Sequence, residues 1–306
     1  MSADRPLRKI TAWKNTTEKL FFILVLFAAL TAIVFLSGII ISIFSQSIQI
    51  FQHTGFWKFI SGTAWHPDQD PAEYGILPLI IGTVTVTIIA MLIGIPLGVG
   101  SAVYIAELAK PREREFLKPV IELLAGIPSV IFGLFGMVYL APFVASFFNL
   151  PTGMTALSAG IILGIMTVPI ISSLSEDSLY SVPRSLREAS LALGGNKWET
   201  IVNIVIPAAK SGIITSIILG FGRAVGETMV VLMVAGNSPV FPKNIFTPVR
   251  PMTSTIAAEM GEAPMGSMHV SALFGIGAVL FIITFTSVIV TEYIRSRIKK
   301  NTGNSI

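Results

Sequence analysis

Two groups of polar residues in this 306-residue sequence have types and spacing that could do chemistry. In the first group, Arg223 and Glu227 stand four positions apart in an otherwise apolar segment, with Thr228 beside them. A guanidinium offers a planar fork of donors that fits the oxygens of an oxyanion. Residues four apart can pair along one helix face, so we expect Glu227 to hold Arg223 in place. Two interpretations stay open: a transient contact for a transported anion, or a structural ion pair that locks helices together.

The second group lies in a polar stretch from residue 176 to residue 210. Ser185 and Glu188 have the spacing of a capping box, and so do Asn196 and Glu199, which predicts two short helices. A pair of glycines between them favours the end of the first helix and a sharp turn. An apolar stripe typical of a helix follows, formed by Trp198, Ile201, Val202 and Val205.

Several kinds of chemistry are not expected. The chain has no Cys, and its three His are scattered, so neither a thiolate nor a histidine metal site is predicted. No Gly-x-x-x-x-Gly-Lys-Ser/Thr loop occurs, so we expect ATP to be hydrolysed by another subunit. The net charge of +4 is spread between hydrophobic tracts, which does not favour a nucleic-acid partner. We therefore predict a non-enzymatic protein without a cofactor.

The elements that must position these residues are membrane-spanning helices. Hydrophobic residues make up 53% of the chain and charged residues 12%, whereas soluble domains have about 25% charged residues. Long uncharged tracts can each cross a hydrocarbon core of about 30 Å. The first is too long for a signal-peptide core and predicts a retained span. We predict six spans, at residues 20–44, 76–106, 120–146, 155–176, 211–236 and 269–292.

Basic residues predict the orientation, because Lys and Arg near span ends stay on the cytoplasmic side. They gather in one set of segments, and the opposite side has only Lys58, Lys243 and Arg250. Both termini are therefore expected in the cytoplasm, and the segments near 45–75 and 237–268 face outward. Small residues four apart predict close helix packing in the membrane at Gly94 and Gly98, Gly160 and Gly164, and Gly222 and Gly226.

The polar stretch resembles the cytoplasmic loop of permease subunits of binding-protein-dependent ABC importers. That loop carries a Glu-Ala-Ala triplet, a glycine and a later Ile-x-Leu-Pro, and this chain has Glu188, Ala189, Ser190 and Gly194, followed by an Ile-x-Ile-Pro that ends at Pro207. Ser and Ile are mild departures. The resemblance implies an all-α, six-helix, MetI-like bundle in which a coupling helix at residues 185–193 docks on an ATPase subunit.

Longer stretches resemble the PstC family of phosphate permeases, at residues 123–136, 222–239 and 272–284, and the likeness covers almost the whole chain. The long outer segment after the first span and the Gly-Glu-Thr-Met sequence favour PstC over the similar PstA family. The resemblance implies import of inorganic phosphate across the lipid of the bacterial inner membrane. The implied partners are a PstA-like permease, a PstB-like ATPase dimer and a PstS-like phosphate-binding protein.

The expected organisation is a cytoplasmic segment (1–19), a first span (20–44), an outer loop (45–75), a permease domain (76–292) with a coupling loop (177–210), and a cytoplasmic tail (293–306). Three rivals remain. The permease could carry another oxyanion, such as sulfate or molybdate. The chain could be a secondary transporter or channel that needs no ATPase. A membrane-embedded enzyme is least favoured, because no cluster of His, Cys or paired carboxylates shares one membrane depth.

Overall fold

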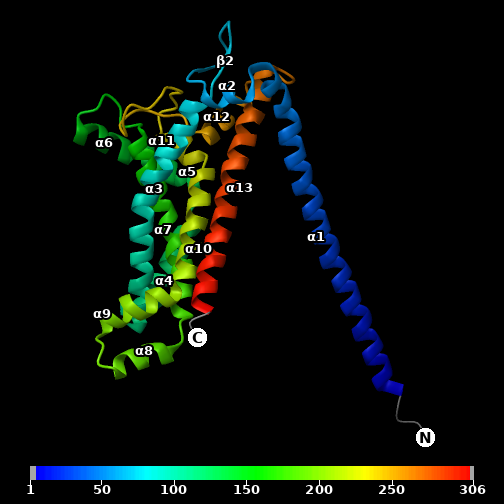
Figure 1. Cartoon of the computed structure of the whole chain (residues 1–306), viewed down its shortest axis with the longest axis vertical. Coiled ribbons are helices and arrows are strands. Elements are labelled where there is room, and N and C mark those ends of the chain that lie inside the picture. Colours follow the sequence, from blue (N-terminus) through cyan, green and yellow to red (C-terminus); the bar gives the residue numbers. More distant parts are fainter. Residues whose placement is uncertain (1–4, 304–306) are drawn as a thin grey trace.

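A computed structural model describes residues 5–303, and its side chains at positions 18–290, 292 and 293. The outermost parts of the predicted cytoplasmic segments, 1–19 and 293–306, lie outside these residues. Helices form most of the described chain (Figure 1). Their bounds are α1 (Arg5–Thr54), α2 (Phe56–Ser61), α3 (Leu77–Val103), α4 (Pro111–Gly126), α5 (Ser129–Phe135), α6 (Ala141–Phe148), α7 (Ala156–Tyr180), α8 (Arg184–Ala192), α9 (Lys197–Thr200), α10 (Ile206–Gly226), α11 (Met229–Val234), α12 (Met252–Glu259) and α13 (Met268–Gly303).

Six helical stretches of the described chain are long and apolar enough to cross a membrane, which confirms the predicted number. They are Glu18–Thr54, Leu77–Leu108, Ser129–Phe148, Ala156–Tyr180, Lys197–Gly226 and Met268–Val290. A short antiparallel hairpin, β1 (Trp65–His66) and β2 (Glu73–Tyr74), projects at one end of the molecule, and α8 and α9 lie at the other (Figure 1).

Two predicted spans are wrong as single helices. The third was expected at 120–146, but α4 ends at Gly126 and α5 begins at Ser129. Pro128 forces the residue before it out of helical conformation, and Ile127 accordingly has a ψ of 128°. The fifth was expected at 211–236, but Glu227 has a ψ of 132° and separates α10 from α11. Both predicted ranges thus contain a break, which lies just before the apolar stretch Ser129–Phe148 in one case and just after the stretch Lys197–Gly226 in the other.

Three five-residue π-helical turns widen the spans, at Tyr104–Leu108, Gly136–Leu140 and Ile201–Val205. The last two end two residues before Pro142 and Pro207. Proline lacks an N–H and clashes with the carbonyl four residues earlier, so an ordinary helical turn does not fit there. The wider turn lets Ile206 donate its N–H to Ile201 O instead. The helix can therefore continue across the proline.

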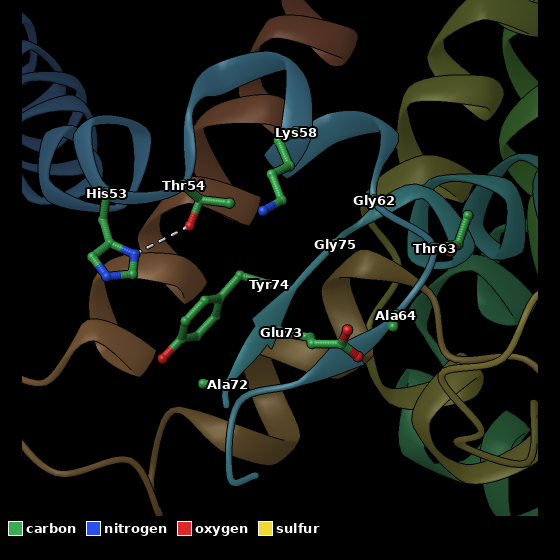
Figure 2. A pocket seen from close by; sticks show the side chains of 10 residues that line it. All are labelled: His53, Thr54, Lys58, Gly62, Thr63, Ala64, Ala72, Glu73, Tyr74 and Gly75. Carbon is green, nitrogen blue, oxygen red and sulfur yellow. Dashed lines mark hydrogen bonds between the residues drawn. The ribbon is translucent and has the colours of Figure 1, made fainter. Parts of the chain in front are cut away.

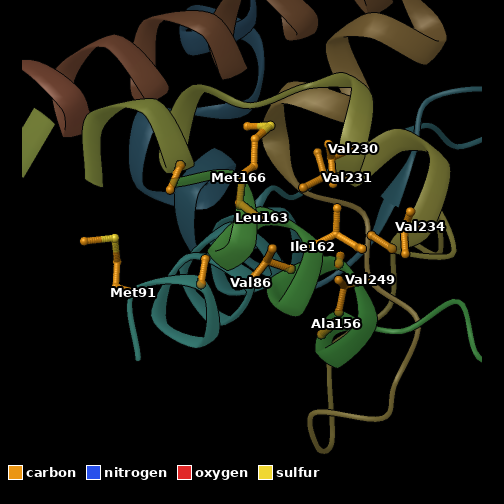
Figure 3. Close-up of a cluster of buried hydrophobic side chains, with 14 of the residues drawn as sticks. Val86, Met91, Ala156, Ile162, Leu163, Met166, Val230, Val231, Val234 and Val249 are labelled. Carbon is orange, nitrogen blue, oxygen red and sulfur yellow. The ribbon is translucent and has the colours of Figure 1, made fainter. Parts of the chain in front are cut away.

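The centre of the bundle is the contact between α3 and α7. Gly94 and Gly98 of α3 lie against α7, and Gly160 and Gly164 of α7 lie against α3, which confirms the close packing predicted for these pairs. The adjoining hydrophobic cluster combines side chains of α3, α7 and α11 (Figure 3), among them Val86, Met91, Ile162, Leu163, Met166, Val230, Val231 and Val234. By contrast, Gly222 and Gly226 have open space beside them within the described chain, so their predicted packing has no partner there.

The first span joins the bundle near its C-terminal end. There Ile50 and Phe59 pack with Trp65, Leu79 and Leu273 in a second buried cluster. The rest of α1 runs apart from the other helices (Figure 1), and its side chains expose large apolar surfaces, as at Phe21, Phe27, Val34 and Phe35. This surface suits lipid or another membrane protein.

The α3–α7 contact predicts that Gly94→Val destabilises the protein. A Cβ at Gly94 would lie 2.3 Å from Thr167 Oγ1 and 3.2 Å from Gly164 O, so the helices must separate. We expect a loss of about 1–3 kcal/mol in the free energy of unfolding, measured as a lower thermal midpoint in detergent. Gly100→Val is the matched control on α3, because no described atom lies within 4 Å of a Cβ there. Equal midpoints for the two variants would contradict the close approach.

Candidate coupling and translocation site

The helix predicted at 185–193 is present as α8. Its start differs from the prediction: Pro183 is the N-cap residue, and no side chain caps the helix. Proline has no side-chain acceptor, and its extended backbone (ψ 137°) places Ser185 inside the first turn. The capping box predicted for Ser185 and Glu188 is therefore wrong.

The end of α8 is a Schellman motif, as the glycine pair predicted. Gly194 has a φ of +87°, a left-handed conformation that glycine adopts without strain. Its N–H donates to Leu191 O, and the N–H of Gly195 donates to Ser190 O, both at 3.0 Å. These bonds fix the angle at which the chain leaves the helix.

The second helix of the loop begins with the predicted capping box. Asn196 Oδ1 accepts a hydrogen bond from Glu199 N, and Glu199 Oε2 accepts one from Asn196 N, both at 2.9 Å. Thr200, the last residue of α9, lies 2.9 Å from Ser190 when measured between their hydroxyl oxygens. This contact ties α8 to α9, and the chain then continues through a π turn into α10.

The outward face of α8 is partly apolar. Glu188 and Ala189 are exposed, and so are the apolar side chains of Leu186, Leu191 and Leu193, the last to 90%. Ser190 points the other way, toward Thr200. A short helix that shows leucines around one carboxylate, in a loop outside the spans, has the composition of a contact surface for another protein.

Sequence reasoning missed the ion pairs that hold this end of the bundle together. Glu176 of α7 is 2% exposed and receives Arg114 Nη2 at 2.6 Å and Lys118 Nζ at 2.7 Å. The hydrogen bond to Glu176 raises the pKa of Lys118 above its ordinary value, which means that the pair favours the charged ammonium. A second pair joins Arg187 of α8 to Glu107, 2.6 Å between Nη2 and Oε1. No local spacing pattern could reveal partners this far apart in the sequence.

The structure separates the residues predicted for the translocation path. The predicted pairing of Arg223 with Glu227 is wrong, because the helix stops at Gly226 and Glu227 does not lie one turn above Arg223. Glu227 is 8% exposed, and its Oε1 accepts hydrogen bonds from Met229 N at 3.2 Å and Val230 N at 3.4 Å. It thus caps the start of α11.

Thr228 and Arg223 differ in their surroundings. Thr228 donates from Oγ1 to Gly226 O at 3.4 Å, so it belongs to the break between α10 and α11. Arg223, in the last turn of α10, is exposed, and within the described part of the chain it has no ion pair. Its guanidinium is available to a group outside the chain.

The two helix breaks are neighbours. α5 packs beside α11. A Cβ placed on Gly133 of α5 would lie 2.7 Å from Met233 Sδ and 3.5 Å from the backbone oxygen of Met229, the first residue of α11. Gly133 lies little more than one turn after the break at Pro128. Non-helical backbone at two adjacent places in spans is tolerated where protein or a water-filled path satisfies its polar groups.

The opposite end of the molecule carries a separate set of polar contacts. Glu259 of α12 accepts hydrogen bonds from Trp65 Nε1 at 3.1 Å and from Arg250 Nη1, and it lies 2.8 Å from His269 Nε2. These contacts tie the β-hairpin to α12 and α13. A cavity of about 240 Å³ opens nearby, between the end of α1, α2 and the hairpin (Figure 2). None of the predicted site residues lines it.

Comparison with known proteins gives one consistent picture. Residues 94–300 match the family model described as binding-protein-dependent transport system inner membrane component. The chain is 40% identical to the probable ABC transporter permease protein YqgH of Bacillus subtilis, over 79% of this chain and 78% of the relative. It is 35% identical to the phosphate transport system permease protein PstC of Mesorhizobium japonicum, over 94% and 92%.

A solved structure supports the fold. The inward-facing MetNI methionine ABC transporter matches 73% of this chain and 94% of its own with a TM-score of 0.55, at 17% identity. The predicted MetI-like, six-helix permease fold is confirmed, and the chain is a multi-pass inner-membrane protein. Its relatives are transport permeases of a class that works with ATPase and binding-protein partners.

The turn after α8 predicts that Gly194→Val loosens the helix end. A β-branched residue in the left-handed region costs about 1–2 kcal/mol, so we expect the amides of residues 190–195 to exchange faster with deuterium in detergent. Gly194→Asn is the matched control, since Asn tolerates this conformation. It should retain near-native protection. Unchanged exchange in the Val variant would contradict the strained turn.

Proposed function

Because the chain belongs to the family of binding-protein-dependent transport system inner membrane components, we propose that it forms half of the translocation pathway of an ATP-driven importer of inorganic phosphate. In this proposal the other half is a PstA-like permease, a PstB-like ATPase dimer hydrolyses ATP, and a PstS-like protein delivers phosphate from outside. The chain itself catalyses no reaction. The observation that carries the proposal is the exposed, partly apolar α8 at the end of a permease bundle.

The coupling loop supports the assignment of an ATPase partner. Glu188, Ala189 and the exposed leucines of α8 would enter a surface cleft of the ATPase, with Glu188 meeting a basic group. Ser190 would contribute indirectly, by holding α8 against α9, and Gly194 would set the angle of the helix. Since the sequence lacks a P-loop, the nucleotide would bind to the partner.

The break in the fifth span supports the anion path. Arg223 would make a transient contact with phosphate, because its planar donors match the anion and no acidic side chain neutralises it within the described chain. Glu227 and Thr228 would keep the break in shape: Glu227 caps α11, and Thr228 bonds within the turn. Phosphate is proposed as the substrate because the 35% identical relative is a phosphate transport system permease.

The membrane orientation of the chain in the proposed importer follows from which elements lie at the same end of the molecule. The described start of α1 and the last turns of α13 lie at the same end of the molecule as α8 and α9 (Figure 1). If α8 meets the ATPase, both termini are cytoplasmic. The hairpin, α2 and α12 then face outward, where a binding protein would dock.

The proposed phosphate import predicts that phosphate, rather than another oxyanion, stimulates ATP hydrolysis by the complex. We would copurify the chain with its native partners, reconstitute the complex in lipid vesicles, and add the binding protein with phosphate, sulfate or molybdate. Phosphate should stimulate ATP hydrolysis and enter the vesicles, and Glu188→Cys should cross-link to the ATPase. Stimulation by sulfate or molybdate alone would assign another oxyanion. Uptake without an ATPase would refute the importer.

The anion contact predicts that Arg223→Gln lowers phosphate uptake about tenfold or more while the complex still assembles. The substitution keeps a polar, though shorter, side chain and removes the charge-assisted bonds, each worth about 1.5–3 kcal/mol. Arg223→Lys, which keeps a point charge without the fork, should fall between Gln and the native residue. Uptake by the Gln variant equal to that of the native complex would return Arg223 to a structural role.

A further inference from the structure

Arg187 lies on α8 directly before Glu188, and its side chain turns toward the spans rather than toward solvent. We propose that Arg187 is the positioning residue that transmits displacement of α8 to the second and fourth spans. The proposal rests on the importer function argued above. It adds a specific mechanical link between the docking helix and the membrane.

One guanidinium joins three elements. Arg187 Nη2 lies 2.6 Å from Glu107 Oε1, and Nε lies 3.4 Å from Glu107 Oε2. Nη2 also donates to Leu179 O at 2.9 Å, and Nη1 donates to Val182 O at 2.5 Å. Glu107 belongs to the π turn that ends the second span, Leu179 belongs to the last turn of the fourth, and Val182 lies in the short connection between the fourth span and α8. The contacts therefore connect α8 to two spans.

Apolar packing cannot supply this connection. No residue of α8 is buried, and the helix packs mainly against α9 and the π turn at Ile201–Val205, so apolar packing does not anchor it on the second and fourth spans. Its other side-chain contact, between Ser190 and Thr200, leads to α9 and the fifth span. The Arg187 side chain is 21% exposed and that of Glu107 is 9% exposed, so water screens their attraction only in part. Because two guanidinium nitrogens of Arg187 face the two carboxylate oxygens of Glu107, the relative orientation of the two side chains is also fixed.

The receiving elements form one packed body. At the end of α7, Leu179 O accepts a hydrogen bond from Val182 N at 3.3 Å, and Arg187 adds a side-chain donor to the same carbonyl, as basic side chains do at helix ends. The glycine contacts hold α3 against α7, and Glu176 holds α4 against α7 through Arg114 and Lys118. A displacement of α8 thus reaches α3, α4 and α7 together through Arg187.

The test is the ratio of phosphate imported to ATP hydrolysed, measured with the complete complex in vesicles. Arg187→Met removes every polar contact at similar length, and Glu107→Gln removes the charge from the acceptor. We expect both variants to hydrolyse ATP and to keep the Glu188→Cys cross-link to the ATPase, while the ratio falls at least tenfold. Arg187→Lys, which keeps a charge but loses the fork, should give an intermediate ratio.

Arg184→Met is the matched control, because Arg184 is an exposed arginine in the first turn of α8 and should leave the ratio unchanged. A residue with a merely structural role would lower hydrolysis, uptake and assembly in parallel and leave the ratio constant, which would overturn the proposal. An unchanged ratio in Glu107→Gln would overturn it as well. Failure of the native complex to couple phosphate uptake to ATP hydrolysis would instead refute the importer function, so the two failures are distinguishable.

Discussion

Every backbone N–H and C=O group within a bilayer needs a partner from the protein, because the hydrocarbon offers none. The spans of this chain satisfy their backbone groups by forming helices. Where the sequence does not allow a regular helical turn, other groups of the protein supply the missing hydrogen-bond partners. Before Pro207, a π turn gives the backbone a new acceptor. At the break of the fifth span, Glu227 accepts two N–H groups of α11, and Thr253 Oγ1 donates to Glu227 O at 2.8 Å.

This requirement divides the bundle into parts that differ in regularity. α3 and α7 are long and packed through glycines, so their contact allows little sliding without a steric clash. The helix is broken at Pro128, where the third span begins, and at Glu227, where the fifth span ends, and the short helices α5 and α11 that follow these breaks pack beside each other. The broken spans hold the non-helical backbone and the exposed Arg223. The second and fourth spans hold Glu107 and Glu176, whose carboxylates pair with basic side chains of α8 and α4.

Local chemistry made much of the fold predictable. Hydropathy predicted six spans, and Gly194 with Gly195 predicted the turn after α8. Both signals depend only on residues that are neighbours in the sequence. The break at Glu227 was not predictable in this way, because an apolar run continues on both sides and the polar residues fit a helical spacing equally well. The link from Arg187 to Glu107 joins residues 80 positions apart, so it depends on how α3 and α7 pack.

The open face of α10 is the surface on which the proposed importer would place a second permease. Gly222, Arg223 and Gly226 all lie on surface that no described part of the chain covers. An arginine at the centre of a span costs about 2.5–3.5 kcal/mol on insertion scales if it faces lipid. Water or another protein must therefore meet it. In the proposed importer, a second permease across a hydrated path would satisfy both needs: it would cover the glycines, and it would leave the guanidinium in contact with water and the transported anion.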